Sequence, residues 1–346
     1  RYISYYFRYD KNCPVGGGVR CGTACQEDQM QILVCVVRAQ GRGERMRKFK
    51  FGVDTFIWSE AFEEKDLWVI KKADELNFKV IDFAVAHPDA FPTQQVINEL
   101  AKTDLIPVTT TTLGYGTNPI SPNPEIRAAA LEHMKCMVNV SKAIGARITG
   151  GVNYAGWGYR TLKPKTLQEW EWGVESMRQI AEYALATYPE LKICVEPCNR
   201  FETHFLNTGY EAVAFCKAVG TPNMGVHLDC FHMSHEEQDW TSAVKVCGKQ
   251  YLGYIHVNEN QRGIPGTGMV DFHTFFGALE DIDYDGYCVI ESFDPNFEEL
   301  AGNCSIWRRF APTGEELAVR GLANLERIAD EVDARREPGP ELQLAD

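Results

Sequence analysis

The sequence predicts an α/β protein, a single-domain (β/α)8 barrel of the TIM type. Three observations lead to this fold class. Short apolar runs typical of strands alternate with longer amphipathic stretches from residue 49 onward, there are eight such runs, and polar residues stand where the later runs end. A doubly wound open sheet is the structural alternative. No G-x-G-x-x-G motif follows the first run, however, so the nucleotide site of that fold has no support.

The predicted elements follow one another as repeated βα units. In the first amphipathic stretch, Leu67, Ile70 and Ala73 step along one face with the period of a helix. The amphipathic stretches cover residues 65–76, 125–144, 167–186, 211–219, 272–282 and 315–332. The strand-like runs cover residues 51–57, 79–85, 105–111, 147–152, 192–195, 225–228, 253–257 and 288–290.

The first 45 residues differ from the rest of the chain. They carry seven basic and four acidic residues, four of the twelve cysteines, and no sustained period of either kind. From Met46 the sequence reads MRKFKFGVDTFIW, which has the pattern of a translation start followed by a first strand. We therefore interpret residues 1–45 as a leader or upstream extension outside the barrel, residues 46–335 as the barrel domain and residues 336–346 as a flexible tail.

The composition argues against several classes of function. The chain has 35 Lys and Arg against 48 Asp and Glu, a net charge of −13, which opposes a nucleic-acid groove that neutralises phosphates. No apolar run approaches the roughly 18–20 residues of a membrane span. The twelve cysteines are scattered, with no paired CxxC zinc pattern. We expect reduced thiols and a cytoplasmic location.

Four polar residues stand at the ends of the last four predicted strands. They are Glu196, Asp229, His256 and Glu291. Because every strand of a barrel points its C-terminal end to the same rim, these side chains are expected to converge. One of them alone would fit a solvent-facing strand end, but four together predict a site for Mn²⁺, Mg²⁺ or a similar divalent ion. His227 is expected to alternate away from Asp229, as a residue of the core or of the surroundings of the site.

Polar and aromatic residues just beyond the strand ends are candidates for substrate contacts. Glu202, His232 and Arg262 follow the fifth, sixth and seventh strands on predicted βα loops, where binding groups commonly lie. A solvated surface position would fit each of them equally. Trp58 and Trp157 follow the first and fourth strands, and aromatic walls are common in sugar sites. Core packing would explain either tryptophan as well.

Four long segments resemble the motif series of the ketose 3-epimerases. They read VEPCNRFETHFLNT, HLDCFHM, GYIHVNENQRGIPGTGMVDF and YDGYCVIESF. This family, the D-tagatose and D-allulose (psicose) 3-epimerases, belongs to the xylose-isomerase-like TIM barrels. The likeness extends over about residues 49–333 and includes IWRRFAPTGEELAVRGLANLERIADE near the end. Residues 1–45 have no counterpart in it.

The resemblance implies a metal-dependent sugar epimerase. Glu196, Asp229, His256 and Glu291 would bind one Mn²⁺ or Co²⁺ ion, with Mg²⁺ possible. Glu196 and Glu291 would also be the catalytic acid/base pair, one removing the C3 proton to give a cis-enediolate and the other returning a proton to the opposite face. The enzyme would be a homo-oligomer, a dimer or a tetramer.

The resemblance also implies the substrate contacts. Glu202, His232 and Arg262 fall on the family positions that hold the carbonyl end of a free ketose, and Trp58 and Trp157 match its pocket aromatics. Ketoses of the D-fructose/D-allulose and D-tagatose/D-sorbose type, and ribulose, are the expected substrates. The segments VIDFAVAHPDAF and VTTTTLGYGT, at the second and third strands, differ from the usual sequences of the family. The preferred ketose is therefore left open.

Three alternatives stand beside the epimerase. An aldose–ketose or hydroxypyruvate isomerase, or an inosose dehydratase, can use a similar metal set on this fold, although NRFETH and NENQRG favour the epimerase. A metal-dependent endonuclease would need more histidine ligands and a basic face, which the net charge of −13 opposes. An inactive sugar-binding barrel is opposed by the presence of both carboxylate bases.

Overall fold

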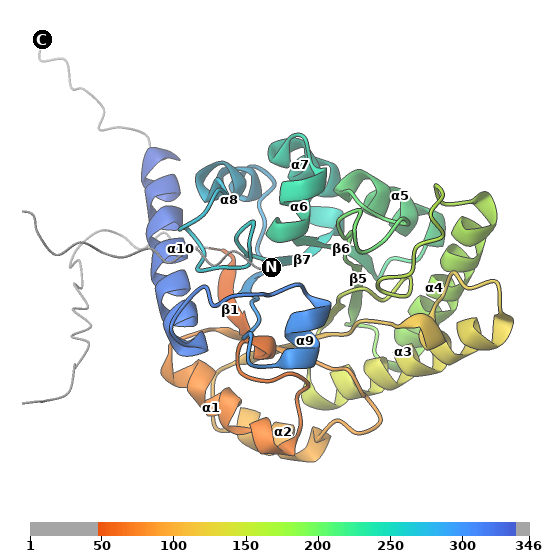
Figure 1. The fold of residues 1–346 in the computed structure, drawn as a ribbon, viewed down its shortest axis with the longest axis horizontal. Helices are drawn as coiled ribbons and strands as arrows, with labels where there is room; N and C mark the ends of the chain where they lie inside the picture. Colours follow the sequence, from red (N-terminus) through yellow and green to blue (C-terminus); the bar gives the residue numbers. More distant parts are fainter. Residues whose placement is uncertain (1–47, 337–346) are drawn as a thin grey trace, which may run out of the picture. The chain divides into compact units, whose positions relative to one another are not determined.

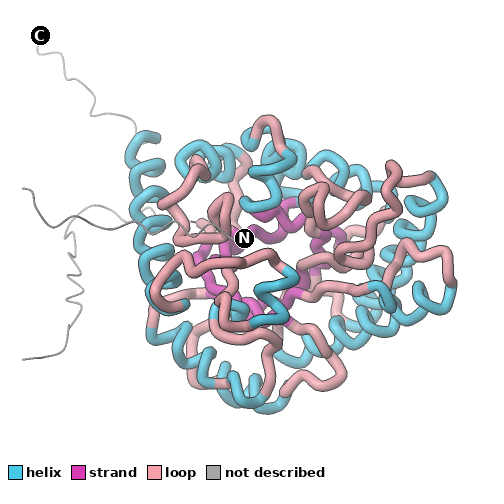
Figure 2. The backbone as a smooth tube through the Cα atoms, viewed as in Figure 1, coloured by secondary structure: helices cyan, strands magenta, loops and turns pink. Residues whose placement is uncertain are grey.

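The computed structural model describes residues 48–336, which form a closed barrel of eight parallel strands. Each strand pairs with the next in chain order, and β8 pairs with β1 to close the ring. Figure 2 shows the ring of strands with helices outside it. The predicted fold class is confirmed. The strands are β1 (Lys50–Asp54), β2 (Val80–Ala84), β3 (Ile106–Thr110), β4 (Ile148–Gly150), β5 (Lys192–Val195), β6 (Met224–Asp229), β7 (Leu252–His256) and β8 (Tyr287–Ile290).

Helices surround the strands, as Figure 1 shows. Four of them, α2, α6, α7 and α9, are not predicted from the sequence. Three of these are eight residues or shorter, too short to display several turns of a period, and α7 is interrupted at Gly248, where φ is 53°. The helices are α1 (Trp68–Glu75), α2 (Thr93–Leu100), α3 (Pro124–Ile144), α4 (Leu167–Thr187), α5 (Gly209–Val219), α6 (Cys230–Glu236), α7 (Trp240–Tyr251), α8 (Phe272–Asp281), α9 (Glu298–Asn303) and α10 (Gly314–Arg336).

The longer helices carry start and stop signals in their sequence. The Asn123 side chain caps α3 ahead of a proline at the first helical position, and the helix ends at Gly145, whose φ of 78° suits a residue without a Cβ. Thr166 and Glu169 form a reciprocal capping box at the start of α4. Short-range hydrogen bonds therefore fix where these helices begin, and with them the lengths of the βα loops.

The first strand ends three residues earlier than predicted. Residues 55–57 form the 3-10 helix η1 (Thr55–Ile57), because the Asp54 carboxylate accepts a hydrogen bond from the backbone N–H of Phe56 and caps the turn. Two further 3-10 turns, η2 (Glu64–Asp66) and η3 (Tyr115–Thr117), lie in the loops after β1 and β3. The turn at η1 changes which aromatic side chain after β1 reaches the mouth of the barrel.

Two layers of side chains fill the inside of the barrel, an apolar layer and a polar layer nearer the C-terminal ends of the strands. Residues two apart on a strand share a face, so each inward apolar residue is followed by another inward residue nearer the C-terminal rim. On β2 and β7 these later residues are Asp82 and His256, both fully buried. Polar groups therefore gather at one end of the barrel above an apolar layer. That layer consists of Val80, Val108, Ile148, Cys194, Tyr254 and Val289.

Some predictions concern residues outside the described range. The leader (residues 1–45), the start at Met46 and nearly all of the tail (336–346) fall there and stay predictions. Within residues 48–336, no helix combines the length and the apolar run that a bilayer span requires.

A close approach between β1 and its two neighbouring strands gives a stability prediction. A Cβ at Gly52 would lie 2.6 Å from Val80 Cβ, 2.7 Å from Val80 O and 2.8 Å from Val289 Cγ2. Since one of these atoms belongs to a backbone inside the closed sheet, we expect Gly52→Ala to lower the free energy of unfolding by about 1–3 kcal/mol. Gly114→Ala is the control, because a Cβ there meets nothing within 4 Å. Urea unfolding midpoints measure both, and equal midpoints would contradict the packing argument.

Candidate active site

Four polar side chains from consecutive strands meet at the C-terminal rim of the barrel. Asp229 and His256 are the last residues of β6 and β7, and Glu196 and Glu291 directly follow β5 and β8. All four are buried. The Nδ1 atom of His256 lies 4.0, 3.5 and 3.5 Å from carboxylate oxygens of Glu196, Asp229 and Glu291, respectively. The structure thus brings together the four residues predicted to bind a metal ion.

The imidazole of His256 is held in one orientation by Asp82. His256 Nε2 lies 3.2 Å from Asp82 Oδ2, which also accepts a 2.6 Å hydrogen bond from the Tyr254 hydroxyl. Thr110 Oγ1 donates to the other oxygen of Asp82 at 3.2 Å. A carboxylate behind one ring nitrogen places the proton on that nitrogen, as is usual for histidines that bind metals. The lone pair of Nδ1 therefore points at the three carboxylates.

The cluster fits a divalent cation. His256 Nδ1 is buried and forms no hydrogen bond within the described residues. Burial raises the pKa of Glu196 well above its usual range, and Asp229 adds to the effect. Burial opposes protonation of His256, but Glu291 leads the groups that raise its pKa. Burial also opposes ionisation of Asp229, but His232 and Arg262 hold the pKa of that carboxyl below its usual range. The oxygen-rich donor set of the cluster suits a divalent metal ion.

Asn258 holds two of the carboxylates in place. Its Nδ2 donates to Asp229 Oδ2 at 2.7 Å and to Glu291 Oε2 at 3.1 Å, while its Oδ1 accepts from the backbone N–H of Glu291 at 3.3 Å. Arg262 Nη1 also donates to Glu291 Oε2. Glu291 Oε1 is therefore the oxygen turned towards His256. In contrast, no hydrogen bond to the carboxylate of Glu196 forms within residues 48–336.

A second group of polar side chains lies beside this cluster. The Asn199 backbone N–H and Nδ2 lie 3.2 and 2.9 Å from His232 Nδ1, so this nitrogen is the acceptor and the proton is on Nε2. Nε2 faces Glu196 and Glu202 at 3.7 and 3.9 Å. Glu202 accepts hydrogen bonds from Trp157 Nε1 at 2.6 Å and Asn199 Nδ2 at 2.9 Å. Glu202 and His232 thus present an acceptor and a donor to the same space.

Arg262 is fixed between two aromatic rings. Its guanidinium carbon lies 4.2 Å from the ring centre of Phe231 and 4.8 Å from that of Phe293. The backbone of Arg262 is in the left-handed region with a φ of 61°, uncommon for a residue with a Cβ. Its carbonyl accepts from Ser292 Oγ at 2.7 Å. This backbone turn sends the guanidinium inward, towards Glu291.

A cavity of about 220 Å³ lies above the cluster. Trp157 lines it, as predicted for a pocket aromatic. Trp58 does not, because η1 turns the chain so that Phe56 lines the cavity while the half-buried Trp58 packs against the core. The polar walls of the cavity include Glu196, Glu202, His232, Arg262, Glu291, Thr112 and Asn303.

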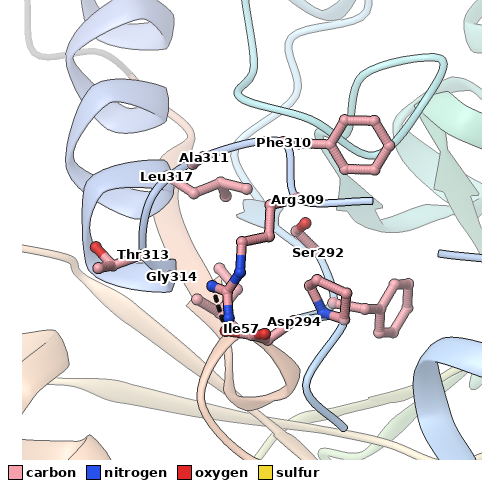
Figure 3. Close-up of a pocket in the computed structure, with 11 residues that line it drawn as sticks. Ile57, Ser292, Asp294, Arg309, Phe310, Ala311, Thr313, Gly314 and Leu317 are labelled. Carbon is pink, nitrogen blue, oxygen red and sulfur yellow. Dashed lines mark ion pairs between the residues drawn. The ribbon is translucent and has the colours of Figure 1, made fainter. Parts of the chain in front are cut away.

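The segment after β8 covers this cavity. Leu300 and Asn303 of α9 line it, and α9 lies over the ring of strands in Figure 1. The backbone N–H of Leu300 donates to Glu60 Oε1 at 2.9 Å. Figure 3 shows Arg309 facing Asp294, at 3.7 Å, beside a cavity of about 20 Å³. That volume suits about one water molecule, so this second cavity is a packing gap and not a sugar site.

Sequence reasoning missed two residues of the site and misplaced a third. Asp82 and Asn258 were not proposed as partners of the cluster. Asp82 is a charge inside an apolar strand, and Asn258 lies two residues after His256, so their positions carried a signal. The expectation that His227 alternates away from Asp229 is wrong. Residues two apart on a strand share a face, and the His227 ring lies inside the barrel with its centre 4.2 Å from that of His256.

Comparisons with known proteins agree with this geometry. Residues 70–328 match the family model of the xylose isomerase-like TIM barrel. A ketose 3-epimerase from Arthrobacter globiformis is 31% identical over 277 residues, covering 79% of this chain and 94% of the relative. A D-psicose 3-epimerase from Ruminiclostridium cellulolyticum is 32% identical over 274 residues, covering 77% and 92%.

Two solved structures also match this chain. The crystal structure of a D-allulose 3-epimerase from Methylomonas sp. matches with a TM-score of 0.77 at 30% identity, covering 82% of this chain and 99% of that one. The structure of an L-ribulose 3-epimerase matches with a TM-score of 0.79 at 26% identity, covering 84% and 100%. The resemblance drawn from the four sequence motifs is confirmed, and the chain belongs to the ketose 3-epimerases, within the xylose isomerase-like TIM barrels.

Proposed function

We propose that this chain is a metal-dependent enzyme that epimerises C3 of free ketoses. Fructose/allulose, tagatose/sorbose and ribulose are its candidate substrates. The observation that carries the proposal is the placement of Glu196 and Glu291. They follow β5 and β8, two strands separated by β6 and β7 in the barrel order, and both carboxylates line one cavity. Inversion at carbon needs one proton-transfer group on each face, and this pair supplies them.

Glu196, Asp229, His256 and Glu291 would hold the metal ion, Mn²⁺ or Co²⁺, with Mg²⁺ as the third candidate. The Nδ1 of His256 forms no hydrogen bond within residues 48–336 and faces three carboxylates, which supports this assignment. A bound divalent ion supplies Lewis-acid stabilisation of the negative charge that develops at the carbonyl when C3 loses its proton. Asn258 and Asp82 orient the carboxylates and the imidazole for this role.

The remaining residues bind the carbonyl end of the sugar and move the proton. Arg262 and the Nε2–H of His232 donate towards the sugar oxygens, and Glu202 accepts from a hydroxyl. One glutamate takes the C3 proton from its face of the sugar, leaving an enediolate. The other glutamate then delivers a proton to the opposite face, and C3 is inverted. Exchange with solvent restores the two glutamates to their starting states.

Removing the metal ion should stop the reaction. We expect treatment with a chelator to abolish fructose conversion and to lower the Tm, because a ligand that binds only the folded state stabilises it. Added Mn²⁺ or Co²⁺ should restore both. Sugar chromatography and a thermal melt measure the two effects. Full activity in protein that elemental analysis shows to be free of metal would rule the proposal out.

Asn258 should control how tightly the ion is held. We expect Asn258→Ala to weaken Mn²⁺ affinity about 10–100-fold, because two carboxylates lose the donor that orients them. Calorimetric titration of the metal-free protein measures the affinity. The control is Asn260→Ala on the same loop, whose side chain accepts from the backbone of Met269. The positioning role would be refuted by equal affinities in the two variants.

The two glutamates should place solvent hydrogen at a single carbon. In D₂O we expect deuterium at C3 of the product and none at C1, since an aldose–ketose isomerase would instead transfer a proton between C1 and C2. Glu196→Gln and Glu291→Gln should each lose at least about 100-fold in kcat, while the exposed Glu299→Gln should not. NMR of the product and metal analysis of each variant are the measurements. Label at C1 alone, or a metal-loaded Glu291→Gln of normal rate, would exclude the two-glutamate mechanism.

A further inference from the structure

The active-site cavity adjoins a second, larger cavity. This outer cavity has a volume of about 390 Å³, against 220 Å³ for the inner one. The two share four wall residues, so the outer cavity begins where the inner one ends, at the Trp157–Glu202 hydrogen bond. Its walls come from the loops after β4 and β5, from α6, and from the end of α9 with the residues that follow it. The shared residues are Trp157, Glu202, Asn303 and Cys304.

The outer cavity joins the carbonyl end of the sugar site. Glu202 belongs to both cavities, and its carboxylate lies 3.9 Å from His232 Nε2. Under the proposed function these groups bind the C1–C2 end of the ketose. The side of the inner cavity lined by Phe56 and Thr112 adjoins a pocket of only about 60 Å³. A group attached to O1 therefore has room that a group attached to O6 does not.

The lining of the outer cavity suits a sugar ring. Phe201 is 64% exposed, and its ring touches His235 edge-on with 6.3 Å between ring centres, which leaves a large apolar surface open to solvent. Phe231 adds a second aromatic wall. Arg160 lines the same cavity and forms no hydrogen bond or ion pair within the described chain. An apolar face next to unused hydrogen-bond donors matches a sugar, whose C–H face is apolar and whose rim carries hydroxyls.

A neutral ring fits these walls better than a phosphate does. Arg160 is the one arginine or lysine among the residues that line the outer cavity, and the Glu202 carboxylate stands in the same wall. A phosphate dianion would face that carboxylate, whereas sugar hydroxyls can donate to it.

We propose that the outer cavity is a subsite for a glycosyl group carried on O1 of the ketose. The substrate class then includes 1-O-glycosyl ketoses in addition to free ketoses. This inference rests on the proposed C3 epimerisation, and it assigns Phe201 and Arg160 to binding the added ring. C3 of such a substrate bears a free hydroxyl, so the chemistry at the metal cluster is the same.

Two disaccharides that differ only in the linkage test the proposal. Trehalulose carries glucose on O1 of fructose, and isomaltulose carries it on O6. With the metal-loaded full chain we expect kcat/KM for trehalulose to exceed that for isomaltulose at least tenfold. Phe201→Ala should lower kcat/KM for trehalulose at least fivefold and change that for fructose less than twofold. Tyr210→Ala, an exposed aromatic on α5, is the matched control and should change neither.

Each other outcome overturns the subsite. Conversion of fructose without trehalulose would reject it and leave the epimerase proposal standing. Preference for fructose 1-phosphate over trehalulose would assign the outer cavity to an anion. Equal losses for both sugars in Phe201→Ala would show that Phe201 acts on the inner site. Failure to convert any ketose would reject the proposed function and the subsite together.

Discussion

Buried negative charge at the mouth of the barrel is the constraint that the surrounding residues satisfy. Asp54, Asp82, Glu196, Asp229 and Glu291 are all buried, and unpaired charges in such a place repel one another strongly. Three of these carboxylates receive side-chain hydrogen-bond donors from neighbouring strands and loops. A cation that balanced the remaining charge would sit between these carboxylates and the lone pair of His256 Nδ1. The oriented carboxylates and the divalent ion proposed for this site thus balance the same buried charge.

The two proposed proton-transfer groups are not equivalent. Asn258 and Arg262 hold one oxygen of Glu291, and Arg262 in turn lies 3.5 Å from His232 Nε2. Glu196 has no such restraint on its carboxylate within the described residues. The Glu291 carboxylate is therefore held by hydrogen bonds, whereas the buried Glu196 carboxylate is held only by packing among three imidazoles at 3.7 to 4.0 Å. Both glutamates line the same cavity, but only Glu291 accepts hydrogen bonds from neighbouring side chains of the described residues.

The fold and the convergence of the four polar residues could be predicted from the sequence because both follow from simple periodicity. Strand ends of a parallel barrel must share a rim, so Glu196, Asp229 and His256 converge whatever the loops do. Phe56 could not be predicted, since its place depends on one hydrogen bond that ends β1 early. Nor could α9, whose six residues show no period and whose position depends on contacts with Glu60, far away in the chain. Loop packing of this kind is not encoded in any local pattern.

The helix that covers the cavity, α9, and the wall residue Glu291 belong to the same segment of the chain. Residues 291–304 begin with a proposed acid/base group, continue through the Phe293 ring that packs on Arg262, and end in the helix that lies over the mouth. Asp294, between the two, is anchored by Arg309. The backbone that leaves Glu291 therefore leads directly into the helix that lines the cavity from above. The roof of the cavity and its Glu291 wall are thus one continuous segment, so their positions are not independent of each other.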